Sequence, residues 1–537
     1  MYISCSALYN NCVPMAFLSS PERAFLRAAS RLAFCNPFLP ERVEHERAAL
    51  GTEFVDDQPV WSFSVSEPDR RRPNVWRIGA RLDELCPRLR TKLAARVAAN
   101  EEDRVLYEDG VLNLLYQRYY PRFFDAGFGE PKGAGPSRWR FYVQFLADWR
   151  HFFEIDGLSL PSGYEPAHTF ACFRQIQCAF ERIFQDIIGN SMPAARLRAA
   201  VWQSIFTHDM RRYRRTLFER MGEFATLITG PSGTGKELVA RAIAESPYLR
   251  FDERRMTFPD DEAPLFFPIN ISALSPTLVE SELFGHRRGS FTGAVGDRKG
   301  WLETCSARGS VFLDELGDLD PGIQVKLLRV IETRRLNPVG DTASLRFQGK
   351  LIAATNRDLA ADIHSRRFRE DLYYRLCSDQ ISTPSLAEQI TDSPQVLRES
   401  IAYMARKIAG AEGEELAAEA MAWVEQNLGP DYSWPGNYRE LEQCVRNVLI
   451  RRNYRPTQPD SGDPADELAR ELRAGRLTAD QLLRRYCTYI YRQSGSYEEA
   501  ARRLGLDRRT VKAKIDDSLG RGVVNRSGGM GVRGPLP

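Results

Sequence analysis

The residues best suited to chemistry form a glycine-rich string that ends in a lysine, Gly230-Pro-Ser-Gly-Thr-Gly-Lys236-Glu237. Glycines let the backbone bend so that several N–H groups point inward and bind phosphate oxygens. Residues 224–229 before the string are apolar and β-prone, and residues 238–244 after it have helical spacing. A strand, a glycine loop and a helix N-terminus predict a phosphate site. Its members are Gly230, Ser232, Gly233, Thr234, Gly235, Lys236 and Glu237.

Two acidic residues after a second predicted strand can supply the magnesium ligand that this phosphate site lacks. Glu237 stands where Ser or Thr usually meets magnesium, so another acidic group must hold the metal. The predicted strand 310–313 is followed by Asp314 and Glu315. We predict that Asp314 holds Mg²⁺ and that Glu315 acts as general base on an attacking water. The alternative is two solvated acids at a strand end.

A third strand and two arginines extend the candidate set. Residues 350–356 form a predicted strand that ends in Asn356, which we expect near the terminal phosphate. Arg369 and Arg375 lie six residues apart, and arginines from a neighbouring subunit can neutralise the charge that develops in phosphoryl transfer. From spacing alone, two surface arginines in helix ion pairs are the simpler interpretation.

A helix start after Trp434-Pro-Gly carries a further cation. Asn437 is predicted as the N-cap, with Glu440 completing a capping box. Arg439 would then lie in the first turn, where the helix dipole disfavours a positive charge. An anionic partner would remove that objection.

The segments that position these residues predict several domains. Residues 186–389 alternate apolar strands with amphipathic helices, which indicates a three-layer α/β fold with a mostly parallel sheet. Residues 1–180 are predicted to be helix-rich, and residues 390–452 all-helical. We expect a linker over 453–475, a helical module over 476–522 and a disordered tail over 523–537.

Composition limits the function classes. The chain has 537 residues, of which 43% are hydrophobic and 27% charged, as in a globular protein. Its ten cysteines include no Cys-x-x-Cys pair, which argues against a cysteine metal site and favours reduced thiols in the cytoplasm. No apolar run approaches the roughly 20 residues of a membrane span, and the N-terminus lacks a signal-peptide layout.

The C-terminal module is basic and has a nucleic-acid pattern. Residues 476–521 contain eleven Lys or Arg and six Asp or Glu. A helix opened by Ser496 with a Glu499 capping box, a turn at Gly505 and a helix capped by Asp507 predict a helix-turn-helix. The alternative is a helical hairpin with a solvated basic face. The candidate DNA contacts are Arg508, Arg509, Thr510, Lys512 and Lys514.

Together these residues resemble the bacterial enhancer-binding proteins, the AAA+ activators of the sigma-54 form of RNA polymerase. The most specific string runs from Glu280 to Ala294, where the family's GAFTGA loop reads Gly-Ser-Phe-Thr-Gly-Ala. An apolar tip between glycine hinges is costly when exposed and useful when it grips a partner. The resemblance covers about residues 186–522 and implies contact with sigma-54 through Gly289, Ser290, Phe291, Thr292, Gly293 and Ala294.

The resemblance also implies a role for each matched position. Lys236, Asp314 and Glu315 would serve ATP and Mg²⁺. Asn270 would restrain the catalytic glutamate, Asn356 and Arg439 would be the first and second sensors, Arg369 and Arg375 would reach the adjacent subunit's site, and Ile188 and Gly189 would border the adenine. The family further implies a helical lid over 390–452, a homo-oligomeric ring of six or seven subunits, and a Fis-like module that binds upstream double-stranded DNA.

Several residues depart from the family pattern. Ser290 replaces the loop alanine and Pro231 a glutamate, and Leu386-Ala387-Glu-Gln389 lacks the usual arginines at the lid junction. Extra residues near 210–221 and 251–262 are interpreted as surface insertions. Residues 1–180 show no acidic pair after a first strand, so we expect control by a ligand or protein rather than by aspartyl phosphorylation.

These observations predict an ATP-driven activator of sigma-54 RNA polymerase holoenzyme that acts without a membrane. One alternative is a DNA-binding AAA+ regulator, such as a repressor, that does not engage sigma-54; Ser290 alone favours it. A second is an AAA+ enzyme that acts on DNA itself, which nothing in the Phe291 loop favours.

Overall fold

The computed structural model describes residues 16–56, 72–128, 136–258, 264–429, 432–456 and 477–520, together with residues 468 and 472. They fall into two compact units, which divide after Tyr454 and are treated separately here. Most of the predicted linker and all of the predicted tail lie outside the described residues.

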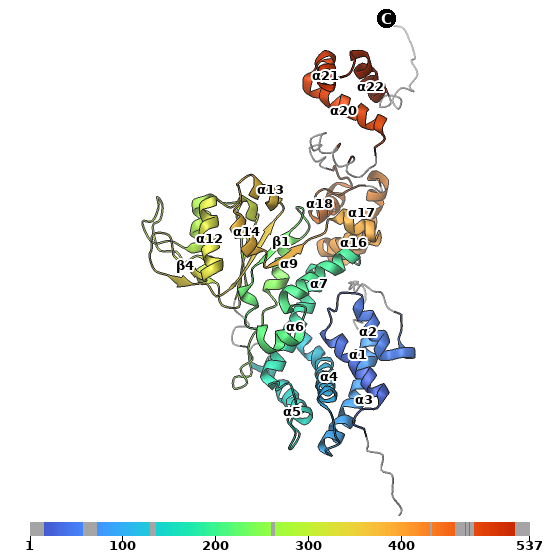
Figure 1. Ribbon diagram of the computed structural model, residues 1–537, viewed down its shortest axis with the longest axis vertical. Helices are drawn as coiled ribbons and strands as arrows, with labels where there is room; N and C mark the ends of the chain where they lie inside the picture. Colours follow the sequence, from blue (N-terminus) through green and yellow to red (C-terminus); the bar gives the residue numbers. More distant parts are fainter. Residues whose placement is uncertain are drawn as a thin grey trace, which may run out of the picture. The chain divides into compact units, whose positions relative to one another are not determined.

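The first unit begins with helices, as predicted, shown from blue to cyan in Figure 1. Ser19 starts the first of them with a capping box, since its hydroxyl accepts from Glu22 N–H while the Glu22 carboxylate accepts from Ser19 N–H. The helices are α1 (Ser20–Phe34), α2 (Glu41–Leu50), α3 (Pro73–Ala94), α4 (Glu101–Phe128), α5 (Tyr142–Phe153) and α6 (Pro166–Asp186).

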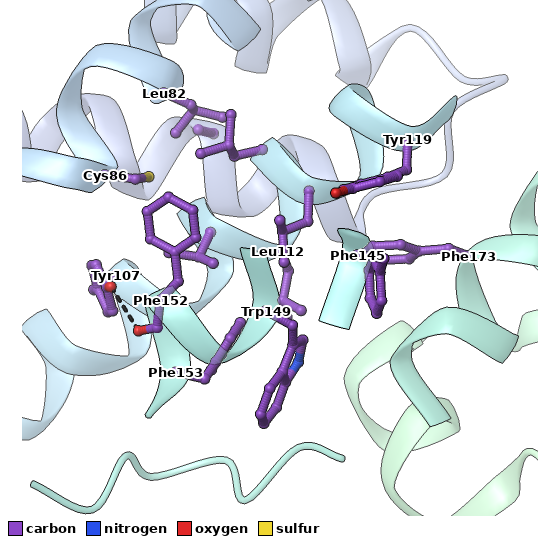
Figure 2. Close-up of a cluster of buried hydrophobic side chains, with 14 of the residues drawn as sticks. Leu82, Cys86, Tyr107, Leu112, Tyr119, Phe145, Trp149, Phe152, Phe153 and Phe173 are labelled. Carbon is purple, nitrogen blue, oxygen red and sulfur yellow. Dashed lines mark hydrogen bonds between the residues drawn. The ribbon is translucent and has the colours of Figure 1, made fainter. Parts of the chain in front are cut away.

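Aromatic side chains fill the core of these helices (Figure 2). Trp149 and Phe153 of α5 stack at 4.9 Å between ring centroids. The Tyr107 hydroxyl of α4 donates to the Phe152 carbonyl at 2.9 Å, so this buried phenol is satisfied. The aromatic run at 116–124 contributes to this core through Tyr119 and Phe123.

A five-stranded parallel sheet forms the centre of the α/β domain. Its strands are β1 (Thr226–Thr229), β2 (Phe266–Asn270), β3 (Ser310–Asp314), β6 (Lys350–Thr355) and β7 (Asp379–Ser382), in the order β2-β3-β6-β1-β7. The three strands predicted to carry site residues, β1, β3 and β6, lie together in the sheet, with β6 between the other two. Their carboxyl ends share one edge, because all pairings are parallel.

Helices and one small hairpin complete this domain. The helices are α7 (Met192–Phe206), α8 (Met210–Arg212), α9 (Lys236–Ala244), α10 (Pro276–Phe284), α11 (Trp301–Thr304), α12 (Pro321–Thr333), α13 (Leu359–His364) and α14 (Glu370–Leu376). The strands β4 (Arg335–Leu336) and β5 (Leu345–Arg346) pair antiparallel.

The lid is all-helical, as predicted, and starts before residue 390. Its helices are α15 (Leu386–Asp392), α16 (Gln395–Ala409), α17 (Gly413–Asn427) and α18 (Asn437–Arg451). They enclose their own apolar core, which includes Leu386, Trp434 and Leu441. The lid therefore folds around a centre distinct from that of the sheet.

The two extra segments are not surface insertions, and that prediction is wrong. Phe251 and Phe258 are 4% and 2% exposed and belong to the core of the N-terminal helices. Tyr213 in the other segment is 1% exposed, and Arg211 beside it pairs with Asp109 of α4 at 2.5 Å. Burying each Phe stabilises the contact by about 1.5–3 kcal/mol. Both segments thus attach the N-terminal helices to the α/β domain.

The boundary that we expected at residue 180 lies inside α6. Phe170 and Phe173 at one end of this helix belong to the N-terminal core. Ala179 and Ile183 at the other end belong to the core that α7, α9 and the sheet share. One continuous helix therefore contributes side chains to both hydrophobic cores.

The second unit is a small helical module. Helices α20 (Ala479–Ser494), α21 (Tyr497–Leu504) and α22 (Arg508–Gly520) surround a core of Cys487, Ile490, Ala500, Val511 and Ile515 with neighbouring residues. Gly505 ends α21 in the left-handed region at φ 64°, which makes the predicted turn.

Candidate nucleotide site and loop

A cavity of ≈ 480 Å³ lies at the carboxyl edge of the sheet, between the glycine loop and the lid. Residues from four predicted groups line it together: Ile188, Ser232 to Glu237, the acids Asp314 and Glu315, and Arg439. Ile188 comes from the segment after α6, and Arg439 from α18 of the lid. The fold therefore brings together most of the nucleotide site expected from the sequence.

Close approach explains two of the loop glycines. A Cβ at Gly230 would lie 2.1 Å from Thr383 Oγ1, and one at Gly233 would lie 2.2 Å from the carbonyl oxygen of Gly436. Both residues also have positive φ, at 147° and 78°. The loop therefore fits tightly against the end of β7 and against the lid.

Lys236 lies at the start of α9 beneath the loop. Its Nζ donates to the carbonyl oxygens of Gly230 and Pro231 at 3.0 and 3.1 Å. Burial lowers the pKa of this ammonium, while the Glu315 and Asp314 carboxylates oppose that shift. A cation held between the loop and two acids suits a phosphate that carries Mg²⁺.

The lid helix does not start as predicted, because Asn437 is its first helical residue and Gly436 is the N-cap. Glu440 Oε2 still accepts from Gly436 N–H at 2.7 Å. Asn437, at φ 52° and 3% exposed, accepts from Leu386 N–H at 2.8 Å and donates to the Ser232 carbonyl at 2.9 Å. Its amide thus connects lid and phosphate loop instead of capping the helix.

Arg439 lies in the first turn of α18, where we expected an anionic partner to offset the helix dipole. It lines the cavity, and its Nη1 donates to Ser232 Oγ at 3.2 Å across the loop–lid boundary. Glu237, also in the cavity wall, pairs with Arg241 at 2.9 Å.

A buried arginine that the sequence reasoning missed fixes the segment expected to border adenine. Arg198 of α7 is 1% exposed and donates to the Ile187 carbonyl at 3.3 Å and to the Gly189 carbonyl at 3.0 Å. Burial lowers the pKa of its guanidinium to about 10. The helical pattern of 192–206 gave no sign of an inward-facing charge.

Gln389 shows what replaces the missing arginines at the lid junction. It is 3% exposed, and its Oε1 accepts from the Tyr438 hydroxyl at 3.0 Å and from Ser191 Oγ at 3.4 Å. At this lid junction, which lacks the family's usual arginines, hydrogen bonds to the neutral Gln389 side chain therefore connect α15, α18 and the start of α7.

The two acids predicted to be catalytic, Asp314 and Glu315, lie at the end of β3. Glu315 has φ 54° and ψ 48°, a left-handed conformation that costs about 1–2 kcal/mol for a residue with a Cβ. Its N–H donates to Asp314 Oδ1 at 3.0 Å. Asn270 is the register partner of Asp314, but its Oδ1 accepts from Ser272 Oγ at 2.8 Å and Ala273 N–H at 3.3 Å.

Six residues predicted for this site do not line the cavity: Gly189, Gly230, Asn270, Asn356, Arg369 and Arg375. Asn356 follows β6 at the same edge of the sheet and is exposed. Arg369 pairs with Asp371 at 2.6 Å, and Arg375 pairs with Glu332 at 3.2 Å. Both arginines lie at the surface, where a second copy of the chain could reach them.

The Phe291 loop is a folded turn between α10 and α11. Gly289 N–H donates to the Ala294 carbonyl at 2.9 Å, and Gly289 and Gly293 have φ of 80° and 101°. The Phe291 ring packs edge-on against His286 at 4.9 Å between centroids. Thr292 is exposed, and the neighbouring Val295 is 84% exposed. The apolar tip is thus only partly covered.

Ser290 lies under this tip. Its Oγ is buried and finds no hydrogen-bond partner among the described residues, and its Cβ lies against Gly340 in the hairpin that joins β4 and β5. The hydroxyl that distinguishes this loop therefore carries a desolvation cost.

The second unit exposes Arg508, Arg509, Thr510 and Lys512 along α22, while Val511 and Ile515 face its core. Asp507 caps the helix as predicted, since its Oδ1 accepts from Arg509 N–H at 2.8 Å. Ser496 caps α21 through Glu498 N–H, whereas Glu499 pairs with Arg502 and Arg503. The predicted capping box is therefore wrong in its second half. Lys514 pairs with Asp480 of α20.

The described residues contain no cluster of three or more His, Cys, Asp or Glu that could hold a metal ion. None of their helices combines the length and hydropathy that a bilayer span requires. The described thiols are free cysteines.

Comparisons with known proteins concern the central part of the chain. Residues 206–382 match the family described as the Sigma-54 interaction domain. The transcriptional regulatory protein ZraR of Klebsiella oxytoca is 38% identical over 308 residues, which are 54% of this chain and 62% of that protein. The Nif-specific regulatory protein of Azotobacter vinelandii is 41% identical over 224 residues, 42% of this chain and 39% of that protein.

The chain thus spans less than two thirds of the length of these relatives. Among solved structures, NtrX from Brucella abortus with ADP is 23% identical and covers 76% of this chain and 86% of its own, at a TM-score of 0.39. A score this low adds nothing to the assignment. The segment 206–382, which carries the glycine loop, the paired acids and the Phe291 turn, matches the Sigma-54 interaction domain family, in agreement with the resemblance of this part of the chain to the AAA+ activators of sigma-54 RNA polymerase.

Proposed function

We propose that the chain is an ATP-driven transcriptional activator that binds upstream DNA and remodels the closed complex of sigma-54 RNA polymerase at its promoter. One observation carries this proposal. The Phe291 turn and the cavity with Lys236, Asp314 and Glu315 belong to the same sigma-54 interaction domain.

The cavity residues suit ATP hydrolysis. Lys236 and the loop N–H groups would hold the phosphates, Asp314 would hold Mg²⁺, and Mg²⁺ would supply charge neutralisation when bound. Glu315 would take a proton from the attacking water. Its left-handed backbone fixes where that carboxylate points, and such strain is typical of catalytic positions.

The remaining parts would serve assembly and recruitment. Arg369 and Arg375, exposed at the start and end of α14, would complete the site of the adjacent subunit in a ring of six or seven copies. The exposed cations of α22 would hold the module in the major groove of upstream double-stranded DNA. Because these partners are DNA and polymerase, we propose that the protein acts in the cytoplasm.

In vitro transcription from a sigma-54 promoter with the full chain tests the proposal. We expect ATP-dependent open complexes with the natural sequence. Phe291→Ala should keep ATP hydrolysis but lose both open complexes and retention of sigma-54 on the nucleotide-trapped ring. Phe224→Ala, at a residue that is 43% exposed outside the loop, is the matched control and should retain all three activities.

Glu315→Gln should bind ATP but reduce hydrolysis by at least about a hundredfold, as expected when a general base is removed. If the natural protein hydrolyses ATP and binds DNA yet leaves sigma-54 holoenzyme closed on templates with its own binding site, the activator proposal fails. That result would favour a regulator that does not engage sigma-54.

A further inference from the structure

A second cavity, of ≈ 260 Å³, lies at the opposite edge of the sheet from the nucleotide site. Ser310 and Lys350, the first residues of β3 and β6, line it at the amino ends of these strands. Gln175 of α6 and the segments around Tyr213 and Tyr248 form other walls. The cavity therefore lies where the N-terminal helices meet the ATPase sheet.

Lys350 is the main charge in this cavity. Its side chain is 8% exposed, and its Nζ donates only to main-chain carbonyls among the described residues, at 3.0 Å to Phe224 and 3.5 Å to Met221. The nearest acid acting on it is Asp379, which is engaged with Thr226 Oγ1 at 2.8 Å. Burial lowers the pKa of this ammonium to about 8, so it is mostly protonated at neutral pH. A buried cation without a carboxylate partner is costly unless an anion joins it.

The other charges of the wall are also mainly positive. Arg308 lines the cavity, and burial together with repulsion from Arg250 lowers its pKa. Arg250 pairs with Glu219 at 2.5 Å, and this pair is 70% and 56% exposed, so it belongs to the rim. Among the described residues that line the cavity, Arg308 and Arg250 each have contacts of their own, so Lys350 is the charge that an anion would chiefly meet.

The rest of the wall is apolar or already hydrogen-bonded. The Tyr213 hydroxyl donates to Gln175 Oε1 at 2.6 Å, and Gln175 Nε2 donates to the Ser246 carbonyl at 3.0 Å. The Tyr248 hydroxyl is bound to His168 Nδ1 at 2.8 Å. Because these polar atoms have partners, the half-buried Tyr248 ring offers mainly apolar surface to a ligand, and the buried Tyr213 ring lies behind it in the wall.

We propose that this cavity binds a small organic carboxylate with an apolar or aromatic body. Its carboxylate lies beside Lys350 and Arg308, and its body packs against Tyr213 and Tyr248. The proposal goes beyond the function proposed above, and ligand binding can be measured whether or not the protein activates transcription. The site spans the boundary of the N-terminal helices and the ATPase fold, so an occupied cavity would stabilise their contact.

Calorimetric titration and thermal melting of the full chain, saturated with ADP to block the nucleotide site, test the proposal. The probes are benzoate and phenylacetate, with benzyl alcohol as their neutral counterpart and inorganic phosphate as an anion without an apolar body. We expect both carboxylates to bind and raise the melting temperature, and the alcohol and phosphate to have little effect.

Lys350→Met should weaken binding by at least about tenfold, because a charged hydrogen bond is lost. Lys299→Met, at an exposed lysine that pairs with Glu303, is the matched control and should bind as the natural sequence does. Arg308→Gln should also weaken binding, and it remains informative if Lys350→Met does not fold. The proposal is overturned if neither carboxylate binds, if the alcohol binds equally well, or if both lining variants retain full affinity.

Discussion

Asn437 is the residue whose replacement should reveal how the lid is coupled to the phosphate loop. Asn437→Ala removes an acceptor from Leu386 N–H and a donor to the Ser232 carbonyl. Leu386 is fully buried, so its N–H would lose its partner at a cost of about 1–3 kcal/mol. Alanine at φ 52° adds about 1–2 kcal/mol of backbone strain.

The total loss for Asn437→Ala is therefore about 2–5 kcal/mol. Asn437→Gly removes the same hydrogen bonds without the strain and should recover about 1 kcal/mol of that loss. Asn437→Asp keeps an acceptor for Leu386 N–H but sets a carboxylate oxygen against the Ser232 carbonyl. We expect it to be less stable than the natural sequence.

Thermal melting of the full chain measures these differences, since each kcal/mol corresponds to about 2–4 °C in a domain of this size. Titration with a fluorescent ADP analogue measures the second effect. We expect at least about tenfold weaker binding in both Asn437→Ala and Asn437→Gly, because the loop loses its connection to the lid. If both variants melt and bind ADP as the natural protein does, the bridging role of Asn437 is refuted.

Three further changes test other contacts. Ser290→Ala removes a buried hydroxyl that has no hydrogen-bond partner among the described residues. Hydrogen exchange of the loop amides should therefore slow, with up to about 1 kcal/mol of added protection. Faster exchange in this variant would contradict the prediction. Arg198→Met should weaken ATP binding about tenfold in calorimetry while changing kcat little, because the turn at Gly189 loses its support; an unchanged Kd would argue against it. Arg211→Met leaves the buried Asp109 carboxylate unpaired and should cost about 2–4 kcal/mol in urea melts at pH 7, whereas the exposed Arg212→Met should cost little. Burial already raises the pKa of Asp109, so the loss should shrink as the pH falls and the carboxyl protonates; a loss that does not depend on pH would contradict this.

Local patterns made much of the nucleotide site predictable. The glycine spacing at 230–235 and the acids after strand 310–313 depend on short-range chemistry, and the fold places both at one cavity. The mostly parallel sheet was predictable from the alternation of strands and helices, whereas the strand order β2-β3-β6-β1-β7 does not follow the order in the chain. The helix-turn-helix was likewise predictable, because its turn glycine and the Asp507 cap act on adjacent residues.

Contacts between distant segments were not predictable. Residues 248–258 contain several charges and read as a surface loop, yet Phe251 and Phe258 are buried against helices far earlier in the chain, and both pack on Phe170 of α6. The capping pattern at Asn437 was misread, because its amide is used by Leu386 and by the phosphate loop instead. The left-handed backbone of Glu315 had no sequence signal, since strain at a catalytic residue runs against local preference.

Helix α6 directly connects the core of the N-terminal helices with the core of the α/β domain. Its 21 residues make a rod about 30 Å long. One end is embedded among the aromatic rings around Phe170, and the other runs without a joint into the Ile187–Gly189 turn beside the nucleotide cavity. A tilt of a few degrees at the aromatic end would displace that turn by an ångström or two, on the order of the precision that catalysis demands. In the activator proposed above, a signal sensed by the N-terminal helices would therefore reach the hydrolysis site through one stiff helix, which cannot be interrupted without exposing apolar surface on both sides.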